Sequence, residues 1–351
     1  MADKSAIEWT DATWNPIVGC SILTPGCTHC YAMGMAARIE AMTAALQAKG
    51  GTGAPHYNGT TRKVNGKAVW TGKLAMAPEH ILTEPLTWRT PRRIFVNSMG
   101  DLFHEDVPDE WIDKVFAIMA LAPQHTFQVL TKRAKRMREY LTGSQPDHRI
   151  VAAQTQLNFR IPQHYQWPHM PLLNVWLGVS AERQQEAEER VHQLIHTPAA
   201  IRFVSAEPLL GPLDFTSLCT GHYFIDALAG RKYHDAPEGV HNATEACAKV
   251  DWIIVGGESG AGARPMHPAW ARSIRDQCAT AGVPFFFKQW GEFAPAFGLD
   301  LRPTGLPWSG ESQTAVARGT ATAQQATRRF GKRRAGRLLD GIEHNAMPQA
   351  R

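Results

Sequence analysis

Three of the six cysteines lie within eleven residues near the start of the chain: Cys20, Cys27 and Cys30, in the stretch GCSILTPGCTHCYA (19–32). An odd number of neighbouring thiols is a poor disulfide framework. Three thiolates can instead hold a 4Fe-4S cluster and leave one of its four irons open for another molecule. A structural zinc site normally takes four protein ligands, so zinc would need a distant fourth side chain. The spacing favours the iron–sulfur cluster over zinc, and zinc over three unliganded thiols.

The composition places these thiols in a reducing compartment. The chain has 351 residues, 44% of them apolar and 20% charged, which is typical of a folded protein with a large core. No run of apolar residues is long enough to span a membrane, and the first residues show no secretory signal. We therefore expect the cytoplasm, that of the host cell if the chain is phage-encoded, where clustered cysteines indicate metal binding or catalysis.

Short apolar runs alternate with helical segments along most of the chain. The predicted strands are 13–19, 92–98, 126–132, 174–180, 201–208, 251–258 and 283–290. The predicted helices are 31–47, 108–121, 134–141, 182–196 and 268–282. Nearly continuous apolar strands that alternate with helices are typical of parallel strands buried on both faces.

This order predicts an α/β fold: a partial or closed (β/α) barrel of six to seven parallel strands over residues 1–293. Three segments interrupt the repeat and are interpreted as insertions, near 48–72, 143–171 and 214–249. Residues 294–351 are interpreted as a basic C-terminal extension with loose packing up to the stretch RLLDGIEH (337–344).

Polar residues follow each predicted strand, where α/β proteins place their sites. They are the three cysteines after the first strand, then Asn97, Ser98 and Asp101, then Thr131, Lys132 and Arg133, then Ser180 and Glu182, then Ser205 and Glu207, then Gly256, Gly257, Glu258 and Ser259, and finally Lys288 and Gln289. Helix capping would explain any one of these residues. Seven successive strand ends of this kind indicate one polar mouth.

Positive charge is uneven. The net charge is +5, and residues 312–339 hold seven bases and no acid: Arg318, Arg328, Arg329, Lys332, Arg333, Arg334 and Arg337. Such a segment favours a polyanionic partner, although a solvated tail would have the same composition.

The three-cysteine loop after the first strand resembles that of the radical S-adenosylmethionine enzymes. Its spacing, C-x6-C-x2-C, departs from their usual C-x3-C-x2-C. Further stretches resemble a phage-associated three-cysteine family: TWNPIVGC, PGCTHCYA, LTKR, LGVSAE, VSAEPLLGP, IIVGGESGAGARPM, PFFFKQWG and AGRLLDG. The resemblance covers residues 7 to 292 and the end of the chain. It implies a radical-SAM-like barrel, a 4Fe-4S cluster, S-adenosylmethionine as cosubstrate and an electron donor such as flavodoxin or ferredoxin.

The resemblance also implies roles for individual residues. Cys20, Cys27 and Cys30 would hold the cluster, and Tyr31 would lie near the adenine. Ser98, Met99, Gly100 and Asp101 end the second strand, where this superfamily handles the methionine amino group with Gly-Gly-Glu, a pattern absent here. Ser180 and Ser205 would contact ribose or carboxylate. Gly256 and Gly257, with Glu258 after them, would let the cosubstrate approach. Positive charge for a phosphate-bearing substrate would come from Lys132, Arg133, Lys288, Arg328, Arg329, Arg333 and Arg334.

The substrate implied by the resemblance is a nucleobase or nucleic acid. The most concrete expectation is an isomerase of thymidine hypermodification that rearranges a glycinyl-thymidine. A radical enzyme of DNA repair or of another base modification is the first alternative. A zinc-stabilised nucleic-acid-binding protein without catalysis is the second. No catalytic side chain is assigned, and no membrane partner is expected.

Overall fold

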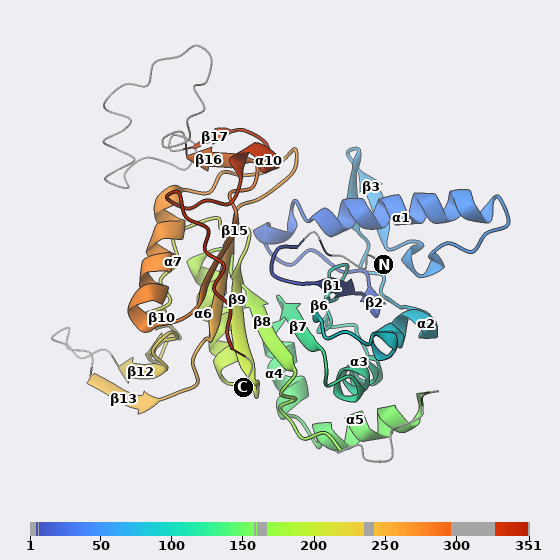
Figure 1. Ribbon diagram of the computed structural model, residues 1–351, viewed down its shortest axis with the longest axis horizontal. Coiled ribbons are helices and arrows are strands. Elements are labelled where there is room, and N and C mark those ends of the chain that lie inside the picture. The colour runs from blue at the N-terminus through green and yellow to red at the C-terminus, as the bar shows by residue number, and fades with distance from the viewer. Residues whose placement is uncertain are drawn as a thin grey trace, which may run out of the picture. The chain divides into compact units, whose positions relative to one another are not determined.

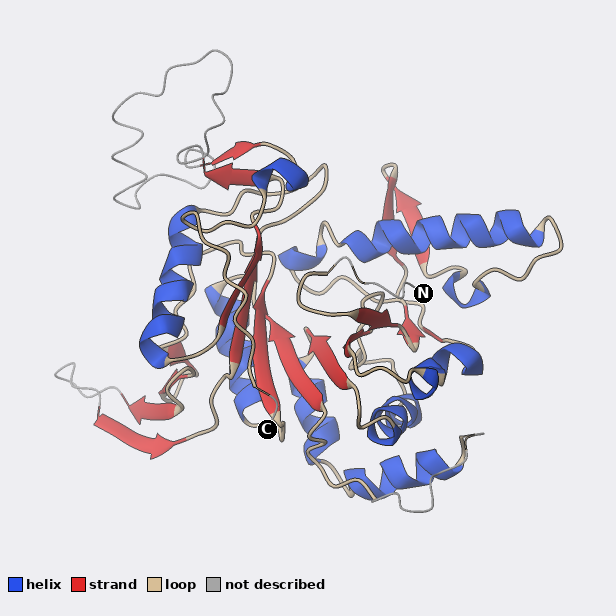
Figure 2. Ribbon diagram, viewed as in Figure 1, coloured by secondary structure: helices blue, strands red, loops and turns tan. Residues whose placement is uncertain are grey.

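The computed structural model describes residues 5, 7–157, 159, 167–234, 242–295 and 327–349. Over these residues the protein is a mixed fold of helices and strands (Figure 2). Its main sheet has seven strands in the order β1-β6-β7-β8-β9-β14-β15. The strands run parallel and form a curled half-barrel. The prediction of a partial barrel of six to seven parallel strands is confirmed in this coarse form.

The seven strands lie in or overlap the apolar runs of the sequence. Their bounds are β1 (Ala12–Trp14), β6 (Arg93–Val96), β7 (Thr126–Thr131), β8 (Val175–Ser180), β9 (Ile201–Ala206), β14 (Trp252–Gly256) and β15 (Phe285–Gln289). Every residue of β8 and β14 is buried, which explains why the runs do not alternate between apolar and polar residues.

Five helices begin and end close to the predicted bounds: α1 (Tyr31–Gln47), α3 (Asp109–Leu121), α4 (Ala134–Thr142), α6 (Gln184–Ile195) and α7 (Pro268–Ala281) (Figure 1). The structure adds α2 (Glu79–Leu82), α5 (Pro146–Thr155) and α10 (Lys332–Ala335), which the sequence did not indicate. Local signals set the ends of α7. The ring of His267 accepts the Ala269 N–H at its start. Gly282 ends it with a φ of 65°, a left-handed conformation that glycine adopts without strain.

The chain divides into two compact units. The first comprises Met1–Val179, His196–Arg202 and Ala350–Arg351, and the second Ser180–Ile195 and Phe203–Gln349. The first unit adds a ribbon of β2 (Ile17–Val18) and β5 (Ala75–Met76). It also holds a hairpin of β3 (Thr61–Val64) and β4 (Lys67–Trp70), within the predicted 48–72 insertion. Three short 3₁₀ helices complete it: η1 (Pro25–Cys27), η2 (Pro55–Tyr57) and η3 (Glu84–Thr87).

The second unit contains a small antiparallel sheet where the sequence indicated an insertion at 214–249. Its strands are β10 (Leu218–Cys219), β11 (Phe224–Asp226), β12 (Arg231–His234) and β13 (Asn242–Ala246), paired in that order. The insertion predicted at 143–171 contains α5 in the first unit. The sequence did not indicate either of these elements.

The described part of the C-terminal extension packs within the second unit, so loose packing up to residue 337 was a wrong expectation there. β16 (Phe293–Pro295), which crosses the predicted boundary at 293, pairs antiparallel with β17 (Thr327–Arg329). Further on, Phe287 donates its backbone N–H to the His344 carbonyl, and the Trp252 indole donates to the Ala346 carbonyl at 2.9 Å. Residues 344–346 therefore lie beside β15, the last strand in the sheet order, and form hydrogen bonds with groups at this edge of the sheet. Arg318 lies outside the described residues.

Among the described residues, no helix is both long enough and apolar enough to cross a membrane.

Candidate functional site

The cysteine loop joins β2 to α1 and is built from two tight turns. The Cys27 N–H donates to the Thr24 carbonyl at 2.8 Å, and the Cys30 N–H donates to the Cys27 carbonyl at 3.2 Å. Pro25 opens η1, which ends at Cys27, and Cys30 is the N-cap of α1. The C-x2-C pair thus lies on consecutive turns at the start of a helix. All three thiols are free of disulfides.

A glycine pair fixes this loop to the end of β6. Gly19 and Gly100 form a parallel bridge, and the Gly19 N–H donates to the Met99 carbonyl at 3.1 Å. A β-carbon on Gly100 would lie 3.0 Å from the carbonyl oxygens of Gly19 and Ile17, so a side chain there would force the two segments apart. The approach of these segments is therefore the structural reason for Gly100.

The predicted residues Ser98 and Met99 are held by Asn15. Its Oδ1 accepts the Ser98 hydroxyl at 3.1 Å and the Met99 N–H at 2.9 Å. The Met99 side chain is buried in the core of the first unit. The Tyr31 ring is exposed, and its hydroxyl donates to the Ser98 carbonyl at 2.9 Å. The structure thus brings Tyr31 and the 98–101 segment together.

Asp101 joins the ends of β6 and β7. Its Oδ1 accepts the Thr131 hydroxyl at 2.6 Å and the Phe103 N–H at 3.0 Å. Its Oδ2 accepts the Lys132 N–H at 3.0 Å and the Arg133 guanidinium at 3.2 Å. Four donors around a buried carboxylate make Asp101 an anchor for the two bases that follow β7.

Arg133 extends from this anchor to the cysteine loop. Its Nη1 lies 3.7 Å from the Cys20 sulfur, and its Nη2 donates to the Ser21 hydroxyl oxygen at 3.0 Å. Its Nε donates to Glu105 at 3.1 Å. Burial alone would lower the pKa of this guanidinium, but Asp101, the Cys20 sulfur and Glu105 raise it above its usual value. A permanent positive charge is therefore buried next to Cys20.

Lys132 gives the other two thiols a positive neighbour. Burial tends to raise the pKa of Cys27, but the Lys132 ammonium and hydrogen bonds from the loop prevail and lower it. Burial raises the pKa of Cys30 in spite of Lys132. Burial, with the negative charge of Asp101, raises the pKa of Cys20 to about 12, and Arg133 opposes this. The positive charges of Lys132 and Arg133, the last two residues of the LTKR stretch, thus act on all three thiols.

Sequence reasoning missed three residues of this network: Ser21, His104 and Glu105. His104 is buried, and its Nδ1 accepts the Asp106 N–H at 3.2 Å, which leaves the ring proton on Nε2. That nitrogen lies 2.7 Å from the Ser21 hydroxyl oxygen, to which it donates. The stretch MGDLFHED (99–106) carries these titratable groups just after a strand, which is the signal that could have found them.

The second unit holds a polar cluster made of residues from two of its strand ends, those of β9 and β15. Lys288 forms an ion pair with Glu207 at 3.1 Å, and the Ser205 hydroxyl donates to the other Glu207 oxygen at 3.1 Å. Glu207 thus joins Ser205 and Lys288, and their role towards a substrate stays a prediction. Ser180, also in this unit, accepts Arg190 through its backbone carbonyl at 2.8 Å.

The expectation that Gly256 and Gly257 leave room for a cosubstrate needs correction. A β-carbon on Gly256 would meet the Glu207 carboxylate at 2.3 Å, and one on Gly257 would meet the Trp290 carbonyl at 2.0 Å. The protein's own groups therefore fill the space that these glycines free. Glu258 is likewise occupied, since Arg264 donates to it from the backbone N–H, Nε and Nη2.

The tail arginines differ from one another in their surroundings. Arg328 and Arg329 belong to β17, and Arg329 donates to the carbonyls of Ala261 and Gly260 and pairs with Glu292 at 3.5 Å. Arg333 and Arg334 lie exposed on α10. Arg329 is exposed as well, but its guanidinium donates to the acceptors just named.

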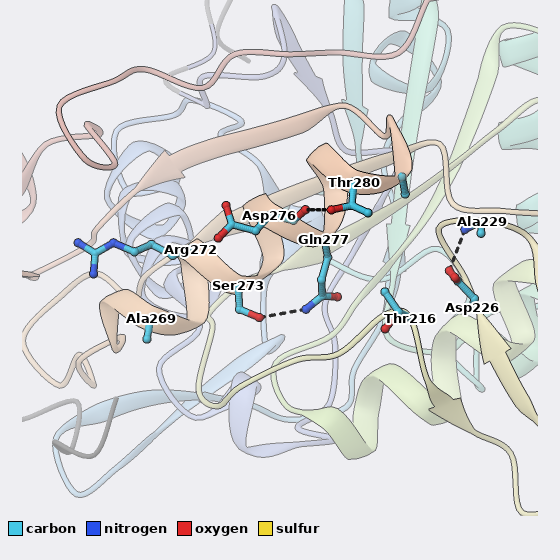
Figure 3. Close-up of a pocket in the computed structure, with 10 residues that line it drawn as sticks. Thr216, Asp226, Ala229, Ala269, Arg272, Ser273, Asp276, Gln277 and Thr280 are labelled. Carbon is cyan, nitrogen blue, oxygen red and sulfur yellow. Dashed lines mark hydrogen bonds between the residues drawn. The ribbon is translucent and has the colours of Figure 1, made fainter. Parts of the chain in front are cut away.

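A pocket of about 730 Å³ lies in the second unit between α7 and the small antiparallel sheet (Figure 3). None of the predicted site residues lines it. Gln277 of α7 donates to Ser273 and to the Leu213 carbonyl and accepts the Phe215 N–H, and Asp226 accepts two backbone N–H groups in the turn after β11. Gln277 thus joins α7 to the segment before the small sheet, which is a structural role.

A family model described as a protein of unknown function, DUF5131, matches residues 4–348. The chain belongs to the DUF5131 family. No curated protein and no solved structure matches it. The function of this DUF5131 protein must therefore be argued from its own side chains.

The donor set of this DUF5131 protein fits an iron–sulfur cluster in its chemistry. The loop offers three thiols. Lys132 and hydrogen bonds of the loop lower the pKa of Cys27 against the effect of burial, whereas burial raises the pKa of Cys20 and Cys30 against the nearby bases. Within the described ranges, no group of three or more His, Cys, Asp or Glu side chains is arranged to hold a metal ion. The fit therefore rests on ligand type, ligand number and the two neighbouring bases.

We expect His104 to make the stability of the protein depend on pH. Burial, and then the charge of Arg133, lower its pKa below 6.5, against the nearby carboxylates. As the pH falls from about 7 to about 5, His104 is protonated in the unfolded chain but stays neutral in the folded protein. Stability is thus lost on acidification, by at most about 1.4 kcal/mol per pH unit for one group.

Urea titrations at several pH values measure this effect. His104→Gln should show a smaller loss of unfolding free energy than the wild type over that range, whereas His148→Gln, at an exposed position, should match the wild type. Equal pH dependence in all three proteins would contradict the assignment.

Proposed function

We propose that this DUF5131 protein is a radical S-adenosylmethionine enzyme that acts on a nucleobase or nucleic acid. One observation carries the proposal: three reduced thiols on one loop lie beside Lys132 and Arg133, and a buried Asp101 holds the segment that bears both bases. When bound to Cys20, Cys27 and Cys30, a 4Fe-4S cluster supplies the electron that splits the sulfonium bond of S-adenosylmethionine.

The two bases stabilise thiolates in a buried place. Three thiolates would repel one another, and burial raises the pKa of Cys20 and of Cys30. Arg133 lies 3.7 Å from the Cys20 sulfur and keeps its charge at every accessible pH. Lys132 favours the thiolates of Cys27 and Cys30. Such charges and donors near sulfur also set the reduction potential of an iron–sulfur site.

Ser21 is the polar group best placed to meet a bound molecule at the loop. Its hydroxyl oxygen accepts from both His104 Nε2 and Arg133 Nη2. Both donors use its lone pairs, so its own hydrogen can donate to an acceptor such as a carboxylate. Because Nδ1 of His104 accepts the Asp106 N–H, the neutral ring carries its proton on Nε2, from which it donates to Ser21.

The substrate class rests on charge and on the resemblance of the sequence. Lys132, half-buried beside the thiols, suits a phosphate-bearing molecule, whereas the buried Arg133 is engaged by Asp101 and Glu105. Within this class, isomerisation of a glycinyl-thymidine in phage DNA is the first reaction to test, and repair or another base modification is the alternative. An electron donor of the flavodoxin or ferredoxin type would be the protein partner.

Anaerobic assay of reconstituted, reduced protein tests the proposal. We expect 5′-deoxyadenosine and methionine from S-adenosylmethionine, quantified by mass spectrometry, and more of both when glycinyl-thymidine DNA is added. The Arg133→Met variant should bind iron less well and form less product, whereas Lys135→Met, at an exposed position of α4, should match the wild type. Colourless protein with one zinc, or no 5′-deoxyadenosine from fully loaded protein, would overturn the proposal.

A further inference from the structure

The β3–β4 hairpin of the first unit is a basic arm that the proposed chemistry does not use. Its strands are joined by Asn65 and Gly66, whose φ angles are 49° and 77°. This is the geometry of a tight two-residue turn for which Asn-Gly is the preferred sequence. Residues 62–67 are all exposed. We propose that this hairpin is a DNA-binding arm that holds the backbone of a B-form duplex next to the cysteine loop.

The first support for this proposal is the positive charge of the hairpin and of the residues around it. The chain has no acidic residue from 41 to 78, and it has five bases there: Lys49, Arg62, Lys63, Lys67 and Lys73. The Lys73 ammonium is occupied by the Asn58 carbonyl at 2.7 Å. In the part of the chain that the structure describes, Arg62, Lys63 and Lys67 take part in no ion pair. Three uncompensated cations on six residues attract a polyanion.

The register of the hairpin distributes these cations around it. Arg62 lies opposite Val69, Lys63 opposite Ala68, and Val64 opposite Lys67. Since side chains alternate between the faces of a ribbon, Arg62 and Lys67 lie on one face and Lys63 on the other. A two-stranded ribbon fits the major groove of B-DNA, and cations on both faces can reach phosphates on either side of the groove. The deep, narrow major groove of an RNA duplex would not admit it.

Val64 is consistent with the same placement. It is exposed at the tip of the hairpin, on the face that carries Arg62 and Lys67. Exposure to water does not stabilise an apolar side chain between two cations. In a major groove this side chain would contact base edges, including thymine methyl groups.

Backbone contacts tie the arm to the cysteine loop. The Gly72 N–H, two residues after the hairpin, donates to the Cys20 carbonyl at 3.2 Å. The Lys73 carbonyl fills the space of the missing Gly19 side chain, since a β-carbon there would lie 2.0 Å from it. Trp70, at the end of β4, packs in one core with Met33 of α1, against which Cys20 and Cys30 also lie. A duplex held by the hairpin would thus be held beside the thiols. The delivery of a base from that duplex to the site rests on the proposed function.

Salt-dependent DNA binding tests the arm without any need for catalysis. The probe is a fluorescent duplex of about two helical turns, titrated with the full-length protein by anisotropy at several salt concentrations. Each phosphate contact adds about 0.9 to the slope of log affinity against log salt. The triple variant Arg62→Ala, Lys63→Ala, Lys67→Ala should therefore lose about 2.7 from the slope and at least about tenfold in affinity at low salt.

A matched control removes the same charge elsewhere. Lys332, Arg333 and Arg334 are also consecutive exposed bases, on α10 of the second unit. If the hairpin holds the duplex, and not the tail bases named in the sequence analysis, their triple alanine variant should keep the wild-type slope. Loss of slope in this control with an unchanged hairpin variant would overturn the proposal, as would tighter binding to an RNA duplex than to DNA. Both variants should retain S-adenosylmethionine cleavage without DNA, so failure of the arm and failure of the radical chemistry give different results.

Discussion

Alanine at Cys20, Cys27 or Cys30 is expected to abolish iron binding by anaerobically reconstituted protein, from about four irons per chain to none. A 4Fe-4S cluster with three protein ligands has no spare thiolate, so loss of one leaves two irons without a protein ligand. The other three cysteines lie outside the cysteine loop, at positions 219, 247 and 278. Iron and sulfide analysis, with the absorbance near 400 nm, measures the result.

The other cysteines provide the controls for this experiment. Cys219 is exposed and Cys278 is buried in the core, where burial raises its pKa to about 12. Cys219→Ala should bind iron as the wild type does. Cys278→Ala should also bind it, with a modest loss of stability from the smaller side chain. Equal loss of iron in these variants, or full iron content in Cys27→Ala, would contradict the assignment of the ligands.

The elements of the fold were readable from the sequence because burial leaves a simple pattern. The run 174–180 has no polar residue between Asn174 and Ser180 and contains β8, which is buried at every residue. The stretch 31–47 has no strong breaker and becomes α1 over the same residues. Contacts between segments that lie far apart in the sequence leave no such pattern. The bond from Phe287 to His344 joins segments more than fifty residues apart, and nothing local predicts it.

The sequence predicted which residues belong to the candidate site, but not which of them contact one another. The sequence indicated Asp101 and Arg133 as polar residues after two strands. Their ion pair depends on the parallel pairing of β6 with β7, which places Val96 beside Val129 and brings the two loops together. The same holds for Gly256, where a resemblance suggested an open approach. Glu207 occupies that space, a contact that only the folded chain shows.

Asp101→Asn is expected to destabilise the iron-free protein by about 3 kcal/mol, the lower end of the range for breaking a buried ion pair. The Asp101 and Arg133 side chains are 7% and 2% exposed, so the guanidinium cannot recover its hydration when the carboxylate is lost. An amide of the same shape also presents a donor to groups that already donate, namely Thr131, Lys132 N–H and Arg133. Urea unfolding of the two proteins measures the difference.

Asp109→Asn is the matched control, because it makes the same chemical change in an ion pair with Arg136 whose side chains are 45% and 25% exposed. Water can replace the lost partner there, so we expect a cost of about 1 kcal/mol or less, including the weaker interaction with the start of α3. The two variants then separate a general effect of charge removal from the role of the anchor. If Asp101 positions Arg133 against Cys20, its variant should also lose iron faster to a chelator after reconstitution, while Asp109→Asn retains iron as the wild type does. A destabilised Asp101→Asn protein with wild-type iron retention would confine Asp101 to the fold and remove it from the proposed site.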